Sequence, residues 1–331
     1  MAEEKRIVLR NYGKIDPLNI DDYLNAGGYK SLEKARSMSQ TDLINEVRKS
    51  GLRGRGGAGF NAGAKWSFAY NTGAEEKYVV CNADEGEPGT YKDRIIMEND
   101  PQSVLEGMAI CAHAIGSKKG YIYCRGEYPY VVEKLNVAIE QAKAKGCLGD
   151  FDIEVRMGAG AYVCGEESAL IESIEGHRGE PRFKPPYPPV IGLWNKPTIV
   201  NNVETFANLP AILEKGADWY SAIGAKSYPG TKVLTLTGDV VNRTFIEVPT
   251  NTTIREVIYD FGGGIPNGKK FKAVQIGGTS GGFIPAEFLD TSIDFDSMAA
   301  ICAALGSGAV FVMDETRDMV DVVQLVERQI V

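Results

Sequence analysis

Between about residues 77 and 176, short β-branched segments alternate with longer helical segments, and this alternation constrains the fold more than any other sequence feature. Strands separated by helices of this length need crossover connections, which favour parallel βαβ units. The predicted strands are 77–83, 119–126 and 151–158. The predicted helices are 100–116, with Asp100 as its cap and Pro101 in its first turn, 128–146 and 165–176. The sequence therefore predicts an α/β fold built on a parallel sheet.

The segments on either side of this alternation are more irregular. Two short helices, 31–38 and 41–51, precede a glycine-rich loop. Five prolines within nine residues open the segment 181–197, which we expect to be an ordered loop because proline neither continues a helix nor donates to a sheet. A helix is predicted over 202–216.

The pattern of predicted secondary structure changes again near Lys232, where short strands follow one another. The predicted strands are 232–241, 243–249 and 271–278. One helix, 253–263, separates the second strand from the third, an order typical of a small α+β module. The chain ends in a predicted amphipathic helix, 316–331.

Composition excludes several classes of protein. Apolar residues are 44% and charged residues 24% of the chain, which excludes a disordered or collagen-like chain. A net charge of -8 argues against a nucleic-acid backbone as the main partner. No apolar run is long enough to span a bilayer, and the polar start lacks a signal-peptide core, so we expect a cytoplasmic protein without a transmembrane segment.

Metal-binding residues are few and scattered. The six cysteines never form a close pair, and the chain has only two histidines, so no clustered soft ligands suggest a zinc or iron–sulfur site. The sequence predicts no metal site. By contrast, glycine is abundant, with 38 residues, and it is concentrated in loops.

The glycine-rich loop 51–60 contains a GxGxxG pattern that starts at Gly54. A predicted helix, instead of a strand, leads into it, which argues against an ordinary Rossmann fingerprint. Glycines still let backbone N–H groups approach a phosphate or a flat ring, and Arg53, Arg55 and Lys65 supply positive charge. The loop therefore predicts a phosphate-bearing ligand, and the alternative is a tight connection between two helices.

Acidic and amide side chains follow the first predicted strand. This group consists of Asn82, Asp84, Glu85, Glu87 and Asp93. The carboxyl ends of strands in open α/β sheets are where ligands bind, and these groups accept hydrogen bonds from ribityl or ribose hydroxyls or from an imide N–H. The alternative is a hydrated acidic turn.

Two more segments carry candidate residues. Glu166 and Glu167 open the helix after the glycines of 158–165, where they would repel a phosphate but suit a ribose or a nicotinamide amide. The alternative is stabilisation of the helix dipole alone. In the proline-rich segment, Lys184 and Tyr187 offer a charge and a stacking ring.

Asn201, Asn202 and Thr205 form the last candidate group, at the start of the helix predicted over 202–216. Asparagine at this position caps a helix in most proteins, so helix capping is the alternative for each of them.

The motifs GLRGRGGAGF, CNADEGEPGTYKDR, GAGAYVCGEESALIESIEG and KPTIVNNVETFANLP together resemble the flavin- and NADH-binding subunit of the NADH-quinone oxidoreductase (complex I) family. This family includes the diaphorase subunits of bifurcating hydrogenases and NAD-dependent formate dehydrogenases. The resemblance covers about residues 40–316. It implies an atypical Rossmann-like FMN domain followed by a small ubiquitin-like (SLBB-type) α+β domain.

The resemblance also implies two sets of binding residues. The residues implied for FMN are Gly54, Arg55, Gly56, Gly57, Lys65, Asn82, Asp84, Glu85, Gly165, Glu166, Asn201, Asn202 and Thr205. The residues implied for NADH are Phe60, Phe68, Glu87, Tyr162, Glu167, Lys184 and Tyr187, with Phe60, Phe68 and Tyr187 around the adenine. No side chain is expected to act as an acid or a base, because hydride transfer depends on the positions of the two rings.

On this basis we divide the chain into four parts. They are an N-terminal helical region with the glycine-rich loop (1–70), an FMN/NADH-binding α/β domain (71–225), an SLBB-type domain (226–314) and the start of a truncated C-terminal helical region (315–331). In the family, a helical domain with clustered cysteines then binds a [4Fe–4S] cluster. Here DETRDMVDVVQLVERQIV is present and that cysteine motif is not, so we expect no cluster in this chain.

The leading hypothesis is an FMN-dependent NADH dehydrogenase (diaphorase) module that passes single electrons to partner iron–sulfur subunits, including a thioredoxin-like [2Fe–2S] subunit. Respiratory, hydrogenase and formate dehydrogenase complexes are all candidates for the assembly. The alternative is a non-catalytic assembly or ligand-binding subunit that keeps the fold.

Overall fold

The computed structural model describes residues 3–330. The helices are α1 (Ile20–Asn25), α2 (Lys30–Ser37), α3 (Gln40–Lys49), α4 (Ala62–Asn71), α5 (Lys92–Asn99), α6 (Pro101–Ile115), α7 (Pro129–Ala144), α8 (Glu167–Ile174), α9 (Val203–Lys215), α10 (Ala217–Ser221), α11 (Ile254–Glu256), α12 (Phe295–Ala300) and α13 (Met319–Ile330). The strands are β1 (Tyr78–Ala83), β2 (Lys119–Cys124), β3 (Asp152–Met157), β4 (Thr198–Asn202), β5 (Gly224–Ala225), β6 (Tyr228–Pro229), β7 (Thr231–Gly238), β8 (Phe245–Pro249), β9 (Phe271–Ile276), β10 (Phe283–Pro285) and β11 (Ala309–Asp314).

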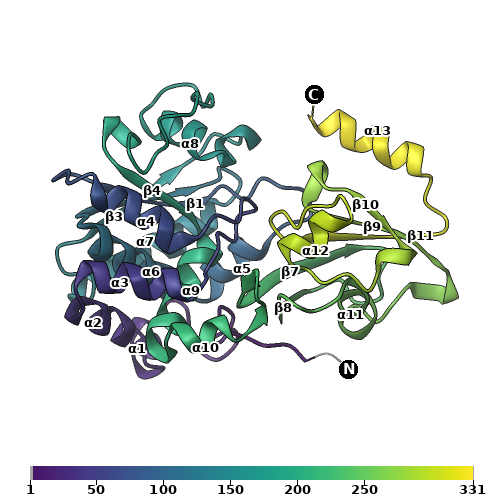
Figure 1. Cartoon of the computed structure of the whole chain (residues 1–331), viewed down its shortest axis with the longest axis horizontal. Coiled ribbons are helices and arrows are strands. Elements are labelled where there is room, and N and C mark those ends of the chain that lie inside the picture. Colours follow the sequence, from purple (N-terminus) through teal and green to yellow (C-terminus); the bar gives the residue numbers. More distant parts are fainter. Residues whose placement is uncertain (1–2, 331) are drawn as a thin grey trace.

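The first sheet is parallel throughout and has the strand order β3-β2-β1-β4. Helices α6, α7 and α9 lie on one side of it, with α2 and α3 outside them and α4 beside α6 and β4, and α8 lies on the opposite side (Figure 1). The central strands β1 and β2 are almost entirely buried, which agrees with their near-continuous apolar sequence. The predicted α/β fold with a parallel sheet is therefore confirmed.

The order of the strands creates a switch point between β1 and β4. The chain runs from β1 to β2 and β3 on one side, and it then returns to β4 on the other side of β1. Asn82 pairs with Asn202 in this register, so both asparagines stand at the carboxyl ends of adjacent strands. Ligands of open α/β sheets bind at such points, because the connecting segments diverge there and leave a crevice.

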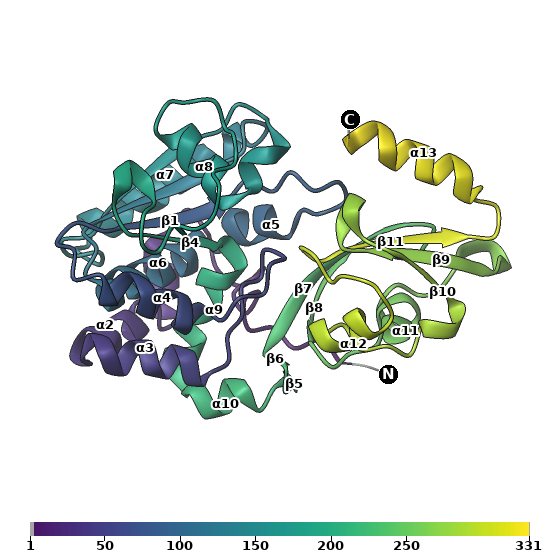
Figure 2. The same cartoon turned by 45° about the horizontal axis from the view of Figure 1, so that its top comes forward.

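The second sheet is mixed and has the order β10-β9-β11-β7-β8. Strand β11 lies parallel to β7, and the other neighbours are antiparallel. This sheet has a separate hydrophobic core, which includes Leu236, Val274 and Val310. Helices α11 and α12 flank the sheet, and α13 projects beside it (Figure 2).

Buried polar contacts join the two parts. The backbone N–H groups of Ile7, Val8 and Leu9 donate to the carboxylate of Glu247 in β8 at 2.8–3.0 Å. The Thr235 hydroxyl in β7 donates to the Gly89 carbonyl at 2.7 Å. These bonds satisfy polar groups that would otherwise be buried without partners.

Comparison with the predicted elements shows where the sequence was misleading. The predicted cap of α6 is confirmed, since the Asp100 side chain accepts from the Ser103 N–H and Pro101 opens the helix. Strand β4 was missed, because residues 198–201 fell between the predicted loop and the predicted helix 202–216 and were assigned no element. Helices α4 and α5 and strands β10 and β11 were also missed.

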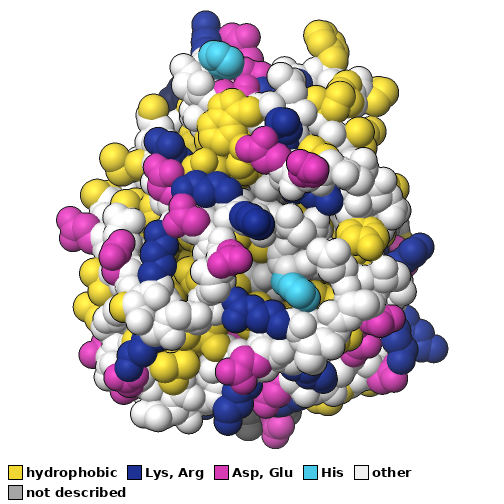
Figure 3. All heavy atoms as spheres, turned by 90° about the vertical axis from the view of Figure 1, so that its left-hand side faces the viewer, with side chains coloured by type: hydrophobic (Ala, Val, Ile, Leu, Met, Phe, Trp, Pro, Cys, Tyr) yellow, Lys and Arg dark blue, Asp and Glu magenta, His cyan; other side chains and the backbone are white. Residues whose placement is uncertain are grey.

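No helix among residues 3–330 is long and apolar enough to cross a membrane. Figure 3 shows the face of the first sheet's domain that is turned away from the second sheet. Lysine and arginine side chains are interspersed there with aspartate and glutamate, as expected for a solvated surface.

Candidate functional site

A cavity of about 790 Å³ opens at the switch point between β1 and β4. Ligand pockets usually measure roughly 300–1,000 Å³, so this one is large enough for a cofactor. Its lining residues are Gly54, Gly56, Ala58, Gly59, Phe60, Lys65, Phe68, Asn82, Gly165, Glu166, Glu167, Lys184, Tyr187, Pro189, Val190, Val200, Asn201 and Asn202. They come from the glycine-rich loop, α4, two strand ends, the turn before α8 and the proline-rich segment.

The glycine-rich loop connects helix α3, which the sequence predicted, to helix α4. Its ends are drawn together, since the Gly54 N–H donates to the Phe60 carbonyl at 2.8 Å and the Ala62 N–H donates to the Leu52 carbonyl at 2.9 Å. Between them, Gly57 and Gly59 adopt positive φ angles of 124° and 64°. Only glycine adopts such angles without strain, so the loop needs glycine at these two positions for its shape.

Other glycines of the loop leave room beside the cavity. A Cβ at Gly54 would have the Phe60 carbonyl oxygen as its nearest neighbour, at 3.7 Å. A Cβ at Gly56 would lie 3.1 Å from Cβ of Asn202, so the loop rests closely on the end of β4. The absent side chains thus leave a cradle in which backbone groups can approach a ligand.

The ends of β1 and β4, with Asn82, Asn201 and Asn202, form the part of the lining that we call the cavity floor. The Asn82 amide donates to the Gly165 carbonyl at 2.8 Å and so ties the floor to the turn before α8. Asn201 accepts from the Trp66 indole N–H at 3.0 Å, and Asn202 caps α9 by accepting from the Glu204 N–H. The floor is therefore rigidly hydrogen bonded.

Two lysines and two glutamates form a charged group on one side of the cavity. Lys65 Nζ donates to Glu167 Oε2 at 2.6 Å and to the Val200 carbonyl at 2.8 Å. Lys184 Nζ lies 2.6 Å from Glu166 Oε1 and 3.4 Å from Glu167 Oε1. Lys65 is only 16% exposed, so it is not a solvated surface charge.

The N-terminus of α8 determines the charge of Glu166. Burial disfavours ionisation of this carboxyl, but bonds from Lys184, Ser168 and the Ala169 N–H outweigh burial and hold its pKa below the usual value. Glu166 therefore stays charged as the N-cap of α8. The predicted pair of carboxylates at this helix start is present, and each one is matched by a lysine.

Aromatic side chains line the outer part of the cavity. Phe60, Phe68 and Tyr187 are 54%, 52% and 56% exposed, although large aromatic side chains are usually buried. The Phe60 and Phe68 ring centroids are 6.4 Å apart and the rings are tilted by 37°. Such exposed rings beside a cavity offer stacking faces for a flat, aromatic part of a ligand.

Asp84 lies beside the floor with an unsatisfied oxygen. Its Oδ2 is buried and has no hydrogen-bond partner among the residues that the structure describes, and a Cβ at Gly165 would lie 3.8 Å from it. Burial raises the pKa of Asp84 to about 6. An orphaned carboxylate oxygen of this kind is satisfied when a ligand brings an O–H or N–H group.

Some of the predicted site residues lie outside the cavity lining. These are Arg55, Gly57, Asp84, Glu85, Glu87, Tyr162 and Thr205.

Arg55 is completely buried and bonds to the second part of the chain. Its guanidinium donates to the Thr231 carbonyl at 3.0 Å and the Tyr220 hydroxyl at 3.0 Å, and it lies over the Tyr228 ring. Its backbone N–H donates to the Thr205 hydroxyl. Arg55 and Thr205 therefore hold the loop in place from behind.

The acidic loop 84–90 is also committed to internal bonds. Buried Glu85 accepts from the backbone N–H groups of Asp93 and Arg94, and burial raises its pKa to about 8. Glu87 accepts from the Thr279 N–H and from the Tyr162 hydroxyl, the latter at 2.6 Å. The predicted NADH contacts Glu87 and Tyr162 thus bond to each other at the junction with the second sheet.

The predictions did not include five residues of the lining, Ala58, Gly59, Pro189, Val190 and Val200. Gly59 belongs to the GxGxxG pattern that was recognised, and Val200 lies in the missed strand β4. The β-branched run 198–200 after Pro197 was a signal for that strand.

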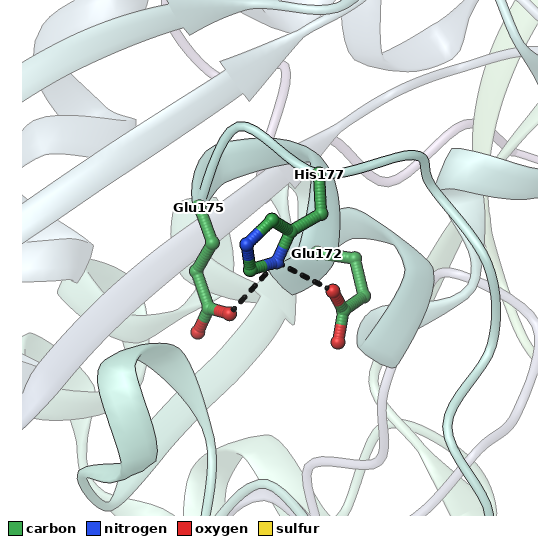
Figure 4. Close-up of side chains that lie close together, drawn as sticks. All are labelled: Glu172, Glu175 and His177. Carbon is green, nitrogen blue, oxygen red and sulfur yellow. Dashed lines mark hydrogen bonds and ion pairs between the residues drawn. The ribbon is translucent and has the colours of Figure 1, made fainter.

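One group of side chains has metal-ligand types but is already engaged in ion pairs. His177 Nδ1 lies 2.9 Å from Glu172 Oε2 and 3.7 Å from Glu175 Oε2 (Figure 4). Both carboxylates also form ion pairs with Arg182. Because Arg182 already pairs with both carboxylates, we read the group as a surface ion-pair network.

The fold and the cavity together define a parallel α/β protein with a glycine-lined cofactor site at its switch point. Residues 47–211 match the protein family described as the Nuo51 FMN-binding domain. Over 97% of its length, the chain is 53% identical to HndC, a subunit of the NADP-reducing hydrogenase of Solidesulfovibrio fructosivorans, and it covers 67% of that protein. It is 50% identical to the F subunit of the NADH-quinone oxidoreductase of Aquifex aeolicus, covering 92% of this chain and 71% of the relative.

Solved structures agree with these matches. A chain of an NAD⁺-reducing [NiFe]-hydrogenase in the H₂-reduced state superposes with a TM-score of 0.82 at 39% identity, over 89% of this chain. Our chain spans about half (50%) of the length of that hydrogenase chain. The chain belongs to the family of these FMN-binding NADH-quinone oxidoreductase and hydrogenase subunits. Membership confirms the predicted family, the oxidoreductase class and the FMN and NAD(H) cofactors.

Proposed function

We propose that this chain transfers a hydride from NADH to FMN within the cavity at the β1–β4 switch point. FMN, when bound, accepts two electrons as a hydride and releases them one at a time. The proposal rests on two features beside one cavity of about 790 Å³. They are the space left by the glycines of the loop and the buried Asp84 oxygen that has no hydrogen-bond partner among the described residues. These features fit a ligand that has both a phosphate and hydrogen-bond donors.

The residues present fit FMN in chemical type. The backbone N–H group of Gly56, together with Lys65, suits a phosphate or a ring oxygen, because glycine lets the backbone approach closely. Gly54, whose N–H already donates to the Phe60 carbonyl, contributes the space left by its absent side chain. Asn82 and Asp84 suit the donors of a ribityl chain or an imide. In this proposal Arg55 and Thr205 hold the glycine-rich loop in place and do not contact FMN directly.

For NADH, the exposed rings of Phe60, Phe68 and Tyr187 provide stacking faces for the adenine. Glu167 and Lys184 provide polar contacts in the same cavity. Glu87 and Tyr162 would have to exchange their mutual bond for bonds to the dinucleotide. The chain contributes to the reaction by holding the two rings in register and by excluding water from between them.

Selectivity between NADH and NADPH follows from the carboxylates. Glu87 and Glu167 near the adenosine ribose would repel the additional phosphate of NADPH. The relative HndC is named as NADP-reducing, so this selectivity is the part of the proposal that most needs its own measurement.

The proposal extends to the rest of the chain. The mixed sheet, with a first hairpin, a crossing helix and a last strand inserted parallel to the first, supports an SLBB-type, ubiquitin-like module over 226–314. We propose the remaining domain boundaries as the sequence suggested them. They give an N-terminal helical region (1–70), an FMN/NADH-binding domain (71–225) and the start of a C-terminal helical region (315–331). The proposal includes iron–sulfur partners, among them a thioredoxin-like [2Fe–2S] subunit, because the named relatives are subunits of larger enzymes. It also includes a cytoplasmic location.

Anaerobic titration of the FMN-loaded chain with NADH tests the proposed function. We expect stoichiometric bleaching of the visible flavin band, and ferricyanide reduction that is faster with NADH than with NADPH. A chain that binds no FMN, or bound FMN that NADH does not reduce, would support the alternative of a non-catalytic subunit.

A further inference from the structure

A cluster of four buried charges adjoins the cavity floor. Lys92 and Asp93 in α5, Glu204 in α9 and Lys232 in β7 are all at least nine-tenths buried. Lys92 Nζ lies 2.6 Å from Asp93 Oδ1 and 3.0 Å from Glu204 Oε2. Lys232 Nζ lies 2.5 Å from the same Glu204 oxygen. Each lysine thus has an acidic partner, as buried ionisable groups require.

The cluster reaches the cavity through the side chain of Asn202. Lys92 Nζ donates to Asn202 Oδ1 at 3.1 Å, and Asn202 Nδ2 donates to Asp93 Oδ2 at 2.7 Å. The Asn202 amide thus accepts one bond from Lys92 and donates one to Asp93. Its remaining bonds go to the Glu204 N–H and the Asn82 carbonyl. These bonds fix the orientation of a residue that lines the cavity.

The glycine-rich loop rests on this same side chain. A Cβ at Gly56 would lie only 3.1 Å from Asn202 Cβ, which is tighter than ordinary packing. Cγ and Nδ2 of Asn202 would lie 3.5 Å and 3.7 Å from the same Cβ, so a rotation that moves the Asn202 amide changes the surface on which the loop rests. Sites whose supporting residues are loose by even about 1 Å lose much of their function.

From this arrangement we infer that Lys92 and Asp93 are positioning residues, which hold Asn202 and through it the glycine-rich loop in the arrangement that receives FMN. The inference rests on the proposed function, because it names the support of the same site. The other half of the cluster touches Lys92 through Glu204, but its side chains do not bond to Asn202. Lys232 and Glu204 connect β7 to α9 and do not donate a side-chain bond to Asn202 or accept one from it.

This division provides a matched pair of double variants. Lys92→Met with Asp93→Asn removes one cation and one anion and leaves the Glu204–Lys232 pair. Glu204→Gln with Lys232→Met also removes one cation and one anion, and it leaves Lys92, Asp93 and Asn202 bonded to one another. Each variant removes one buried lysine and one of its acidic partners, so we expect a general loss of stability of similar size in the two.

The measurement is the dissociation constant of FMN for the FMN-free chain, followed by quenching of flavin fluorescence, with the melting temperature measured in parallel. We expect the Lys92/Asp93 variant to bind FMN at least tenfold more weakly than the unmodified chain. The Glu204/Lys232 variant should stay within threefold of the unmodified chain. The absorption band of FMN should also broaden only in the Lys92/Asp93 variant, because the ring is less firmly held.

Equal FMN affinities of the two double variants, whether both are weakened or both unchanged, would overturn the inference while the unmodified chain still binds FMN. Absence of FMN binding by the unmodified chain would instead refute the proposed function and the inference with it. If the Lys92/Asp93 variant does not fold, Asp93→Asn alone is used, since it preserves shape. It should weaken FMN binding about threefold, and an unchanged affinity would overturn the inference.

Discussion

The glycine at position 54 allows the cradle to be tested with a single methyl group. Gly54 lines the cavity, its φ angle is not positive, and an added Cβ would have its nearest neighbour at an ordinary van der Waals distance of 3.7 Å. Gly54→Ala should therefore leave the fold intact. Replacing glycine by alanine in a compatible conformation stabilises a protein by about 0.4–1 kcal/mol, because the unfolded chain has fewer conformations.

The same methyl group should weaken FMN binding. An additional carbon in a closely packed contact costs about 1–3 kcal/mol, which corresponds to a dissociation constant roughly 5–150-fold higher. Stability and affinity should thus change in opposite directions. Gly282→Ala is the matched control, since its Cβ would also meet only ordinary contacts, with the nearest at 3.6 Å, and Gly282 does not line the cavity.

The assay measures FMN affinity by fluorescence quenching and the midpoint of urea unfolding on FMN-free protein. The reasoning is refuted if Gly54→Ala binds FMN as tightly as the unmodified chain does, because the cradle then has spare room. It is also refuted if Gly54→Ala and Gly282→Ala lose affinity equally. Gly57→Val is a poorer test, because the positive φ of Gly57 makes any branched side chain strain the backbone itself.

Other predictions concern the charged groups. Lys65→Met should weaken FMN binding by about 1.5–3 kcal/mol, the scale of a hydrogen bond to a charged group. Lys49→Met on the surface should leave FMN binding unchanged. Equal FMN affinities of the two variants, measured by titration, would contradict this prediction. The folded pKa of Asp84, about 6, exceeds the unfolded value, so its contribution to stability falls as pH rises from about 4 to 6. As the pH rises over this range, the free energy of unfolding of Asp84→Asn should increase by about 1–2 kcal/mol relative to that of the unmodified chain, measured by urea unfolding. A difference that does not change with pH would contradict the assignment. Glu167→Gln should raise the ratio of NADPH to NADH turnover with ferricyanide, and an unchanged ratio would remove Glu167 from the selectivity argument.

Local signals in the sequence predicted the regular part of the fold. The cap at Asp100 followed by Pro101 located the start of α6, and the period of the apolar residues distinguished β1 to β3 from the helices between them. The prediction that a helix leads into the glycine-rich loop was also confirmed. These features depend on neighbouring residues, so a single sequence is sufficient to recognise them.

Features that depend on distant contacts were not predictable in this way. Strand β4 follows a proline-rich loop and continues directly into α9, so no turn signal separates them. Arg55 stands beside cavity-lining glycines, yet its side chain turns to Tyr220 and Thr231, which are more than 160 residues away in the sequence. The role of Lys92 beneath Asn202 likewise arises only when α5 packs against α9.

A crystal structure of the chain with FMN tests the central claim most directly. We predict FMN in the cavity at the switch point, with the glycine-rich loop on one side and Asn82 and Asp84 within hydrogen-bond distance on another. FMN bound at any other place, or crystals grown in saturating FMN that show this cavity without it, would contradict the account.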